Sequence, residues 1–201
     1  MFGSALEIFI VAGLFMMAIA AISAILIRRV YRKRYALRDE YVAAERAANE
    51  VRTKEIEPEY FFAPDWSALP DNPPPNVVTC AQKQMMRFPT RMTNLEIKQR
   101  YGIGNLERVA FCEDNFSRYI AALIEWGESL LPQPEGIAIL QETVKLGSDF
   151  RKTYILLADH YATVKAFEDL EHMYDQIETN ITDTSTKRNL REHVSSLFPA
   201  Q

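Results

Sequence analysis

The chain has 201 residues, of which 48% are apolar, and this length suits one domain of ordinary size with appendages. Only seven residues are glycine, and no long stretch alternates apolar and polar side chains, so the composition predicts an all-α protein. The formal net charge of −4 is uneven: residues 1–57 carry 9 basic and 7 acidic side chains, whereas residues 58–201 carry 14 and 20. An acidic C-terminal part repels phosphate, which argues against nucleic acid as a partner.

The first predicted element is a stretch of 20 residues without a charge, IFIVAGLFMMAIAAISAILI, from Ile8 to Ile27. As a helix it would span about 30 Å, the thickness of the hydrocarbon core of a bilayer. A cleaved signal peptide carries its basic residues before the apolar run, whereas here they follow it. We therefore predict one transmembrane helix over residues 8–27, bordered by a basic cluster that contacts lipid headgroups. The basic cluster comprises Arg28, Arg29, Arg32, Lys33, Arg34 and Arg38.

The position of this cluster predicts the orientation of the chain, because basic residues beside a transmembrane helix favour the cytoplasmic side. We expect the short N-terminus, residues 1–7, to lie outside the cell, with the rest of the chain on the cytoplasmic face of a plasma membrane. Cys80 and Cys112 occur in no metal-binding spacing, which agrees with free thiols in a reducing compartment.

Residues 28–57 are rich in alanine, glutamate and arginine, which predicts a helical stalk that continues the membrane helix until Pro58. A short parallel coiled coil is one reading, because apolar side chains recur at heptad spacing. We favour the other reading, a solvated single helix, since the seam is rich in alanine and shorter than three heptads. The heptad positions are Leu37, Tyr41, Ala44, Ala48 and Val51.

Residues 58–92 form a predicted linker, because seven of the ten prolines fall between residues 58 and 89, including NPPPN. Successive prolines favour extended chain over helix. Four aromatic side chains lie close together in this linker, and we expect them to dock on the helical domain, since burial within one chain orders fewer groups. A motif that a partner buries is the alternative. The four are Tyr60, Phe61, Phe62 and Trp66.

Residues 93–201 are predicted to form a helical domain. The TNLE sequence offers Thr93 as a helix cap, with Glu96 completing a capping box, and Gly102 ends this helix. Apolar residues at spacings of three and four, separated by breakers such as PQPEG and GSD, predict the helices that follow. Their expected ranges are 106–131, 134–146, 151–162, 166–179 and 188–197.

Two hairpins of this domain resemble the tetratricopeptide repeat (TPR), a helix–turn–helix unit of about 34 residues. With Arg151 as repeat position one, the packing positions hold Tyr154, Leu157, Ala158, Tyr161, Tyr174 and Ile177. The same frame shifted back by one repeat places Ile120, Leu123, Gly136, Leu140, Thr143 and Ser148 at packing positions. The resemblance covers residues 117–183 and implies a stack of antiparallel helical hairpins. A plain helical bundle with similar spacing is the alternative.

The resemblance also implies a binding groove lined mainly by the first helix of each hairpin. The matching positions are Arg118, Ala121, Glu125 and Glu128, followed by Lys152, Ile155, Asp159 and Thr163. Mixed charges and apolar patches suit an extended peptide or a basic helix of a protein partner. We therefore expect a membrane-anchored adaptor or assembly factor that needs no cofactor. Such stacks usually need about three repeats, so we expect the flanking helices, residues 94–101 and 188–197, and the long helix that begins at Leu106 to cap this one, with self-association as the alternative.

An enzyme is not predicted, because no nucleophile elbow, phosphate-binding loop or dinucleotide-binding motif occurs, and an enzyme of unrecognised class is kept only as an alternative. The three histidines, His160, His172 and His193, form no HExxH pattern or other metal-ligand spacing, so we expect surface or helix-end side chains. Cys112 follows Phe111 and precedes Glu113, and burial or the adjacent carboxylate would raise the pKa of its thiol and lower its reactivity.

The main alternative is a membrane-tethered DNA-binding regulator that uses residues 93–112 as a helix-turn-helix, with Gly102 at the turn. Two features argue against it. Lys98 lies where close helix contact needs a small residue, and Arg108 lies where a buried aliphatic side chain is expected. The would-be recognition helix, NLERVAFCEDNF, has a net charge of −2, which phosphate repels.

Overall fold

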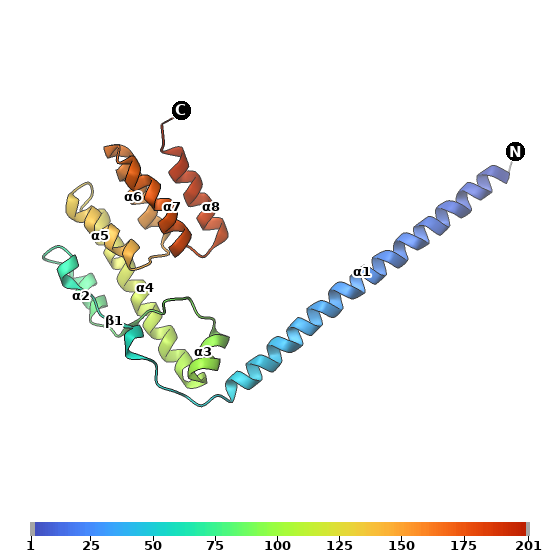
Figure 1. Ribbon diagram of the computed structural model, residues 1–201, viewed down its shortest axis with the longest axis horizontal. Coiled ribbons are helices and arrows are strands. Elements are labelled where there is room, and N and C mark those ends of the chain that lie inside the picture. The colour runs from blue at the N-terminus through green and yellow to red at the C-terminus, as the bar shows by residue number, and fades with distance from the viewer. Residues whose placement is uncertain (1–2, 200–201) are drawn as a thin grey trace. The chain divides into compact units, whose positions relative to one another are not determined.

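The computed structural model describes residues 3–199, and the chain forms two compact units (Figure 1). The anchor unit comprises Met1–Lys54 and Met92–Leu106, and the helical unit comprises Glu55–Arg91 and Glu107–Gln201. The chain therefore passes between the units three times. The predicted outer terminus covers residues 1–7. Residues 1–2 of it lie outside the described part of the chain, and only the backbone of residues 3–7 is described.

The anchor unit is dominated by α1 (Gly3–Asn49), a continuous helix of 47 residues that spans about 70 Å. Within the described part of the chain, α1 is the one helix that is long and apolar enough to cross a membrane. The described side chains of its apolar segment, up to Ile27, are exposed. The stalk continues the apolar segment without a break, as predicted, but the helix ends at Asn49 and not at Pro58.

The C-terminal end of α1 packs against α3 (Asn94–Tyr101), which explains why only the later heptad positions are buried. Leu37 and Tyr41 remain exposed, whereas Ala44 is half-buried and Ala48 is buried. The small alanines allow a second helix to approach, and this helix comes from the same chain. Within this one chain the first half of the stalk is therefore exposed and its end is covered by α3, whereas the choice between a solvated helix and a coiled coil with a second copy stays a prediction.

Residues 50–54 explain why α1 stops early, because they leave the helix to bind the end of α3. The Lys54 amide donates to the Tyr101 carbonyl at 3.0 Å, and Asn105 Nδ2 donates to both carbonyls, at 2.7 Å for Lys54 and 2.8 Å for Tyr101. Gly102, at φ 85°, lies so close to Thr53 that a Cβ would be 2.8 Å from its backbone. Asn105 belongs to the short 3₁₀ helix η3 (Ile103–Asn105).

The capping box predicted for α3 is present. Thr93 Oγ1 accepts from the Glu96 amide at 3.3 Å, and the Thr93 amide donates to Glu96 Oε2 at 2.7 Å. Ile97 and Tyr101 are buried, and Lys98 Nζ lies 2.9 Å from Glu45 Oε1 of α1. The lysine that argued against a DNA-binding motif therefore joins α3 to the stalk.

The helical unit is a succession of antiparallel helices in which α6 packs against α5, α7 and α8 (Figure 1). Local signals set the ends of these helices. Pro134 opens α5, Lys165 adopts a left-handed conformation after α6, and Asp183 caps α8 by accepting from the Thr186 amide. The helices are α4 (Leu106–Ser129), α5 (Pro134–Lys145), α6 (Arg151–Val164), α7 (Phe167–Asn180) and α8 (Thr184–Ser196).

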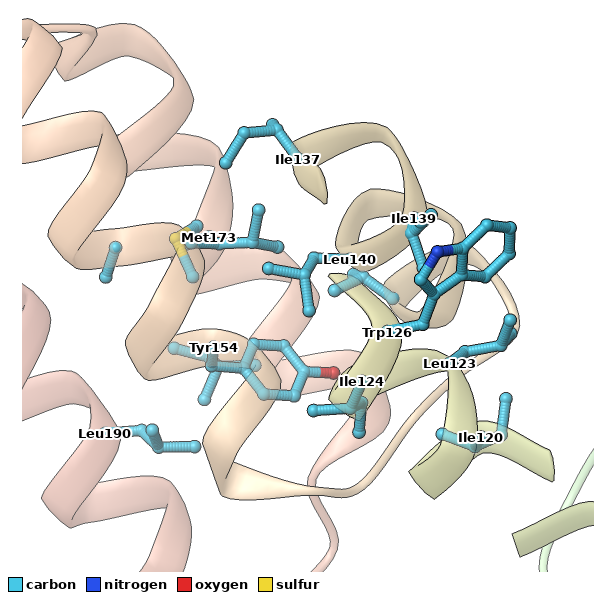
Figure 2. Packing of buried hydrophobic residues seen from close by; sticks show 14 of the residues in the cluster. Ile120, Leu123, Ile124, Trp126, Ile137, Ile139, Leu140, Tyr154, Met173 and Leu190 are labelled. Atoms are coloured by element: carbon cyan, nitrogen blue, oxygen red, sulfur yellow. The ribbon is translucent and has the colours of Figure 1, made fainter. Parts of the chain in front are cut away.

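One hydrophobic core runs through these five helices (Figure 2). Of the twelve positions that the repeat frame assigns to packing, eleven are buried and Tyr174 is half-buried. Close approach of α4 and α5 depends on two glycines, because a Cβ on Gly136 would lie 2.6 Å from the Gly127 carbonyl oxygen. Each of the five helices contributes a fully buried side chain: Leu123, Leu140, Tyr154, Met173 and Leu190.

The extended linker predicted over residues 58–92 is wrong in part, because this segment folds onto the helical unit. Helix α2 (Pro75–Ala81) begins at the last proline of NPPPN. Proline is tolerated at the first helical position, where its missing N–H has no helical acceptor to bind, and Val77 then enters the core. Strands β1 (Phe61–Phe62) and β2 (Met85–Met86) pair antiparallel, and the short helices η1 (Pro58–Tyr60) and η2 (Trp66–Ala68) flank β1.

The predicted docking of the aromatic side chains is confirmed for the two phenylalanines. The Phe62 ring lies 5.1 Å from Phe116 and 5.9 Å from Tyr119 on α4, and the Arg108 guanidinium lies 5.1 Å from the Phe61 ring. Trp66 keeps 43% of its surface exposed.

Candidate functional site

Six of the residues predicted to line a groove, the five charged ones and Ile155, lie on α4 and α6. Their charged side chains are exposed and Ile155 is half-buried, and the Lys152–Glu128 ion pair joins the two helices at the surface. We name this surface the partner face. It comprises Arg118, Glu125, Glu128, Lys152, Ile155 and Asp159.

Ion pairs join the helices of the partner face. Lys152 Nζ on α6 lies 2.5 Å from Glu128 Oε2 on α4, and His193 Nε2 on α8 lies 2.9 Å from Asp159 Oδ1 on α6. The second pair spans 34 residues, which is the period of the repeat frame. Sequence reasoning left His193 as an unassigned surface side chain, although its position one period after Asp159 could have placed it on this face.

The charged residues of the partner face differ in whether they already form an ion pair. Arg118 Nε binds Asp114 of its own helix at 2.7 Å, and three more charged members engage neighbouring helices as described. Glu125 is exposed, and it forms no ion pair with another described residue. Glu125 is therefore the charge on this surface that an incoming basic group could bind without displacing a partner.

Cys112 has the environment that sequence analysis expected of an unreactive thiol. Its side chain is buried, and its Sγ lies 3.7 Å from Gln84 Oε1. Burial raises the pKa of the Cys112 thiol, and Arg108 offsets this only in part. Cys80 is also free and is half-buried. Within residues 3–199, no group of three or more histidine, cysteine, aspartate or glutamate side chains could hold a metal ion.

A polar cleft of about 270 Å³ lies elsewhere on the helical unit, and no residue of the partner face lines it. We name it the Arg87 cleft. Its walls come from the loop after β2, from α4, and from the loops that follow α5 and α7. Its main polar and aromatic lining comprises Arg87, Arg91, Glu113, Phe116, Asp149 and Asn180.

The Arg87 cleft contains charges of both signs in a partly desolvated setting. Burial lowers the pKa of Arg87. Burial also raises the pKa of Glu113, and the charge of Arg91 opposes that rise. Arg91 Nη1 lies 4.0 Å from Asp149 Oδ2, and both side chains are exposed. Sequence analysis missed this cleft because its walls come from segments up to about 90 residues apart, and no local pattern joins them.

Two further cavities have a different character. One of about 500 Å³ lies beside Trp66 and prolines of the segment before α2. The other lies on the outer face of α8, where the lining is polar or charged. A polar outer face on the last helix of a stack is typical of a cap that keeps the end soluble.

Comparison of the chain with protein-family models, with curated proteins and with solved structures found no match. The candidate sites therefore rest on the residues and contacts described above.

Proposed function

We propose that this protein is a membrane-anchored adaptor or assembly factor that binds a protein partner through the partner face. In this proposal α1 crosses a plasma membrane once, with its N-terminus outside and the helical unit in the cytoplasm. The basic cluster after the apolar segment contacts anionic headgroups. Holding a binding surface beside the bilayer raises the local concentration of its partner, which requires no catalytic chemistry.

The observation that carries the proposal is the way α4, α6 and α8 contribute to one surface. The pairs Glu128–Lys152 and Asp159–His193 each join one of these helices to the next. This arrangement is what the repeat resemblance implies for the first helices of successive hairpins, so we propose a TPR-like stack. The exposed carboxylate of Glu125 and the half-buried Ile155 then supply a charged and an apolar contact for a basic peptide or helix.

Crosslinking in native membranes followed by mass spectrometry identifies the partner. The double variant Glu125→Lys and Asp159→Lys is then expected to lose capture of that partner, because both carboxylates of the proposed contact are reversed. Glu171→Lys serves as the matched control, since Glu171 is an exposed carboxylate on α7, outside the partner face. Equal capture by the double variant and the wild type would reject the partner face.

The orientation has its own test. Single cysteines are introduced in a background in which Cys80 and Cys112 are replaced by serine. A cysteine at Ser185 on α8 is expected to react with a membrane-impermeant maleimide only after the cells are broken. Labelling of this site in intact cells would show that the helical unit is outside.

A further inference from the structure

Arg87 has an arrangement that a ligand would complete. Its backbone amide donates to the Tyr60 carbonyl at 2.9 Å, which fixes this point of the chain. Its guanidinium lies 6.0 Å from the centre of the Phe116 ring. The same group lies against Gly147, where a Cβ would collide with Nη2. Residues from a strand end, a long helix and a loop thus hold one guanidinium at the cleft.

The hydrogen-bond donors of the Arg87 guanidinium are not used by other side chains. Among residues 3–199, no carboxylate forms an ion pair with Arg87 and no side-chain hydrogen bond of Arg87 is present. Its five N–H donors therefore have no described protein acceptor. The Arg87 side chain is exposed overall, and the partial burial of its guanidinium lowers the pKa of Arg87, because the charged form loses part of its hydration without compensation from an ion pair. An anion with two acceptors would supply that compensation through a pair of parallel hydrogen bonds.

The surroundings decide which anion fits. Glu113 and Asp149 also line the cleft, so a doubly charged phosphate would meet two carboxylates. Arg91 lies 4.0 Å from Asp149 and balances its charge, so the cleft can accept a single additional negative charge. A carboxylate carries one charge and matches the planar fork of arginine. A cavity of about 270 Å³ is just below the usual range for small-molecule sites, so it suits one acidic group with its nearest atoms.

We infer that the Arg87 cleft binds a carboxylate group, with Arg87 as its bidentate partner and Phe116 and Gly147 as the residues that position the guanidinium. The group is a small organic acid, the C-terminus of a peptide or an acidic side chain. This inference does not rest on the partner face, because the two surfaces share no residue.

The test uses the full chain in lipid nanodiscs and saturation-transfer-difference NMR, which detects weak ligands. The probes are acetate, inorganic phosphate, N-acetyl-tetra-alanine with a free C-terminus, its C-terminal amide, and an amidated peptide in which one alanine is glutamate. Binding of acetate alone indicates a small acid as the ligand. Binding of the free-acid peptide or of the glutamate peptide indicates a chain end or a side chain. Each of these three results supports the inference.

The variants separate a specific contact from general charge. Arg87→Gln is expected to weaken binding of the best carboxylate probe about tenfold or more, because it removes two charge-assisted hydrogen bonds. Arg87→Lys keeps the charge but not the fork and is expected to weaken binding as well. Glu113→Gln removes a like charge and is expected to strengthen binding. Arg188→Gln is the control, since Arg188 is an exposed arginine on α8 that belongs neither to the Arg87 cleft nor to the partner face.

The inference is overturned if no carboxylate probe binds the wild type, if phosphate binds more tightly than acetate, or if Arg87→Gln and Arg188→Gln bind alike. The thermal unfolding temperature of each variant shows whether it folds. If Arg87→Gln does not fold, Arg87→Lys and Glu113→Gln decide the question, and unchanged binding in both would contradict the inference.

Discussion

Asp159 on α6 and His193 on α8 lie 34 residues apart in the chain and 2.9 Å apart in space. The pair Glu128–Lys152 makes the corresponding link between α4 and α6 at 2.5 Å. Both links are at the surface, so they report how neighbouring helices are placed more than they stabilise the unit. They provide the first test of the helix arrangement.

A charge-swap cycle tests the link between α4 and α6. Glu128→Lys and Lys152→Glu each place like charges together and are expected to lower the free energy of unfolding by about 0.5–1 kcal/mol, with the double swap restoring most of it. Chemical unfolding of the four proteins measures the coupling. Zero coupling would mean that these two side chains are apart in solution.

The crossing of α4 and α5 predicts a difference between two glycines. Gly136→Ala is expected to lower the free energy of unfolding by about 1–3 kcal/mol, because the new Cβ would lie 2.6 Å from the Gly127 backbone oxygen. Gly127→Ala is expected to cost less, since the nearest atoms to its added Cβ, Leu140 Cγ at 2.9 Å and the Gly136 carbonyl oxygen at 3.1 Å, are farther away than the 2.6 Å contact at Gly136. Gly13→Ala is the control, because nothing lies within 4 Å of its added Cβ. Equal effects of the first two changes would contradict this crossing.

Acid stability is expected to depend on Asp183, the cap of α8. Hydrogen bonds from the Ser185 hydroxyl and then from Thr186 lower the pKa of Asp183 from 3.8 to about 2. Because the pKa is lower in the folded state, the carboxylate stabilises the fold above about pH 4, and this contribution is lost as the pH falls through about 2. Asp183→Asn keeps a capping side chain but cannot titrate, so its stability should change less over this interval.

Thermal unfolding by circular dichroism at about pH 5, 3 and 2 measures this difference between the wild type and Asp183→Asn. The expected result is that their unfolding temperatures converge as the pH falls. A constant difference across all three values would show that Asp183 does not provide the titrating contribution.

The junction of α1 and α3 is expected to depend on Asn105, which is buried and donates to two carbonyls. Asn105→Ala removes both hydrogen bonds, so it should cost about 1–3 kcal/mol locally, although the Tyr101 carbonyl keeps its bond from the Lys54 amide. Hydrogen exchange is expected to speed up in residues 94–101 and to stay unchanged in α7. Unchanged exchange in α3 would contradict the role assigned to Asn105.

The helices from α3 to α8 could be predicted because residues close in sequence determine where they begin and end. Thr93 with Glu96, Pro134 and Asp183 act on backbone groups within one turn, so their effect does not depend on distant parts of the chain. Helix α8 begins at Thr184, four residues before the predicted start at Arg188, because Asp183 caps it. The aspartate was visible in the sequence as a capping residue.

Elements that depend on tertiary contact could not be predicted in the same way. Helix α2 forms after successive prolines because Val77 is buried in the core, and burial of that kind has no local signal. The early end of α1 depends on Tyr101 and Asn105, which accept and donate about 50 residues away. The Arg87 cleft was missed for the same reason, since its walls meet only in the folded chain.

Because the chain returns to α1 at α3, a non-covalent contact joins α1 to the later part of the chain in addition to the backbone. A protease cut between residues 55 and 57 would break the one covalent connection between α1 and the rest of the chain. Helix α3 would still pack against the stalk through Ile97, Tyr101 and the Lys98–Glu45 pair. Separation of α1 from the rest of the chain would then require both a break in the backbone and the unfolding of α3.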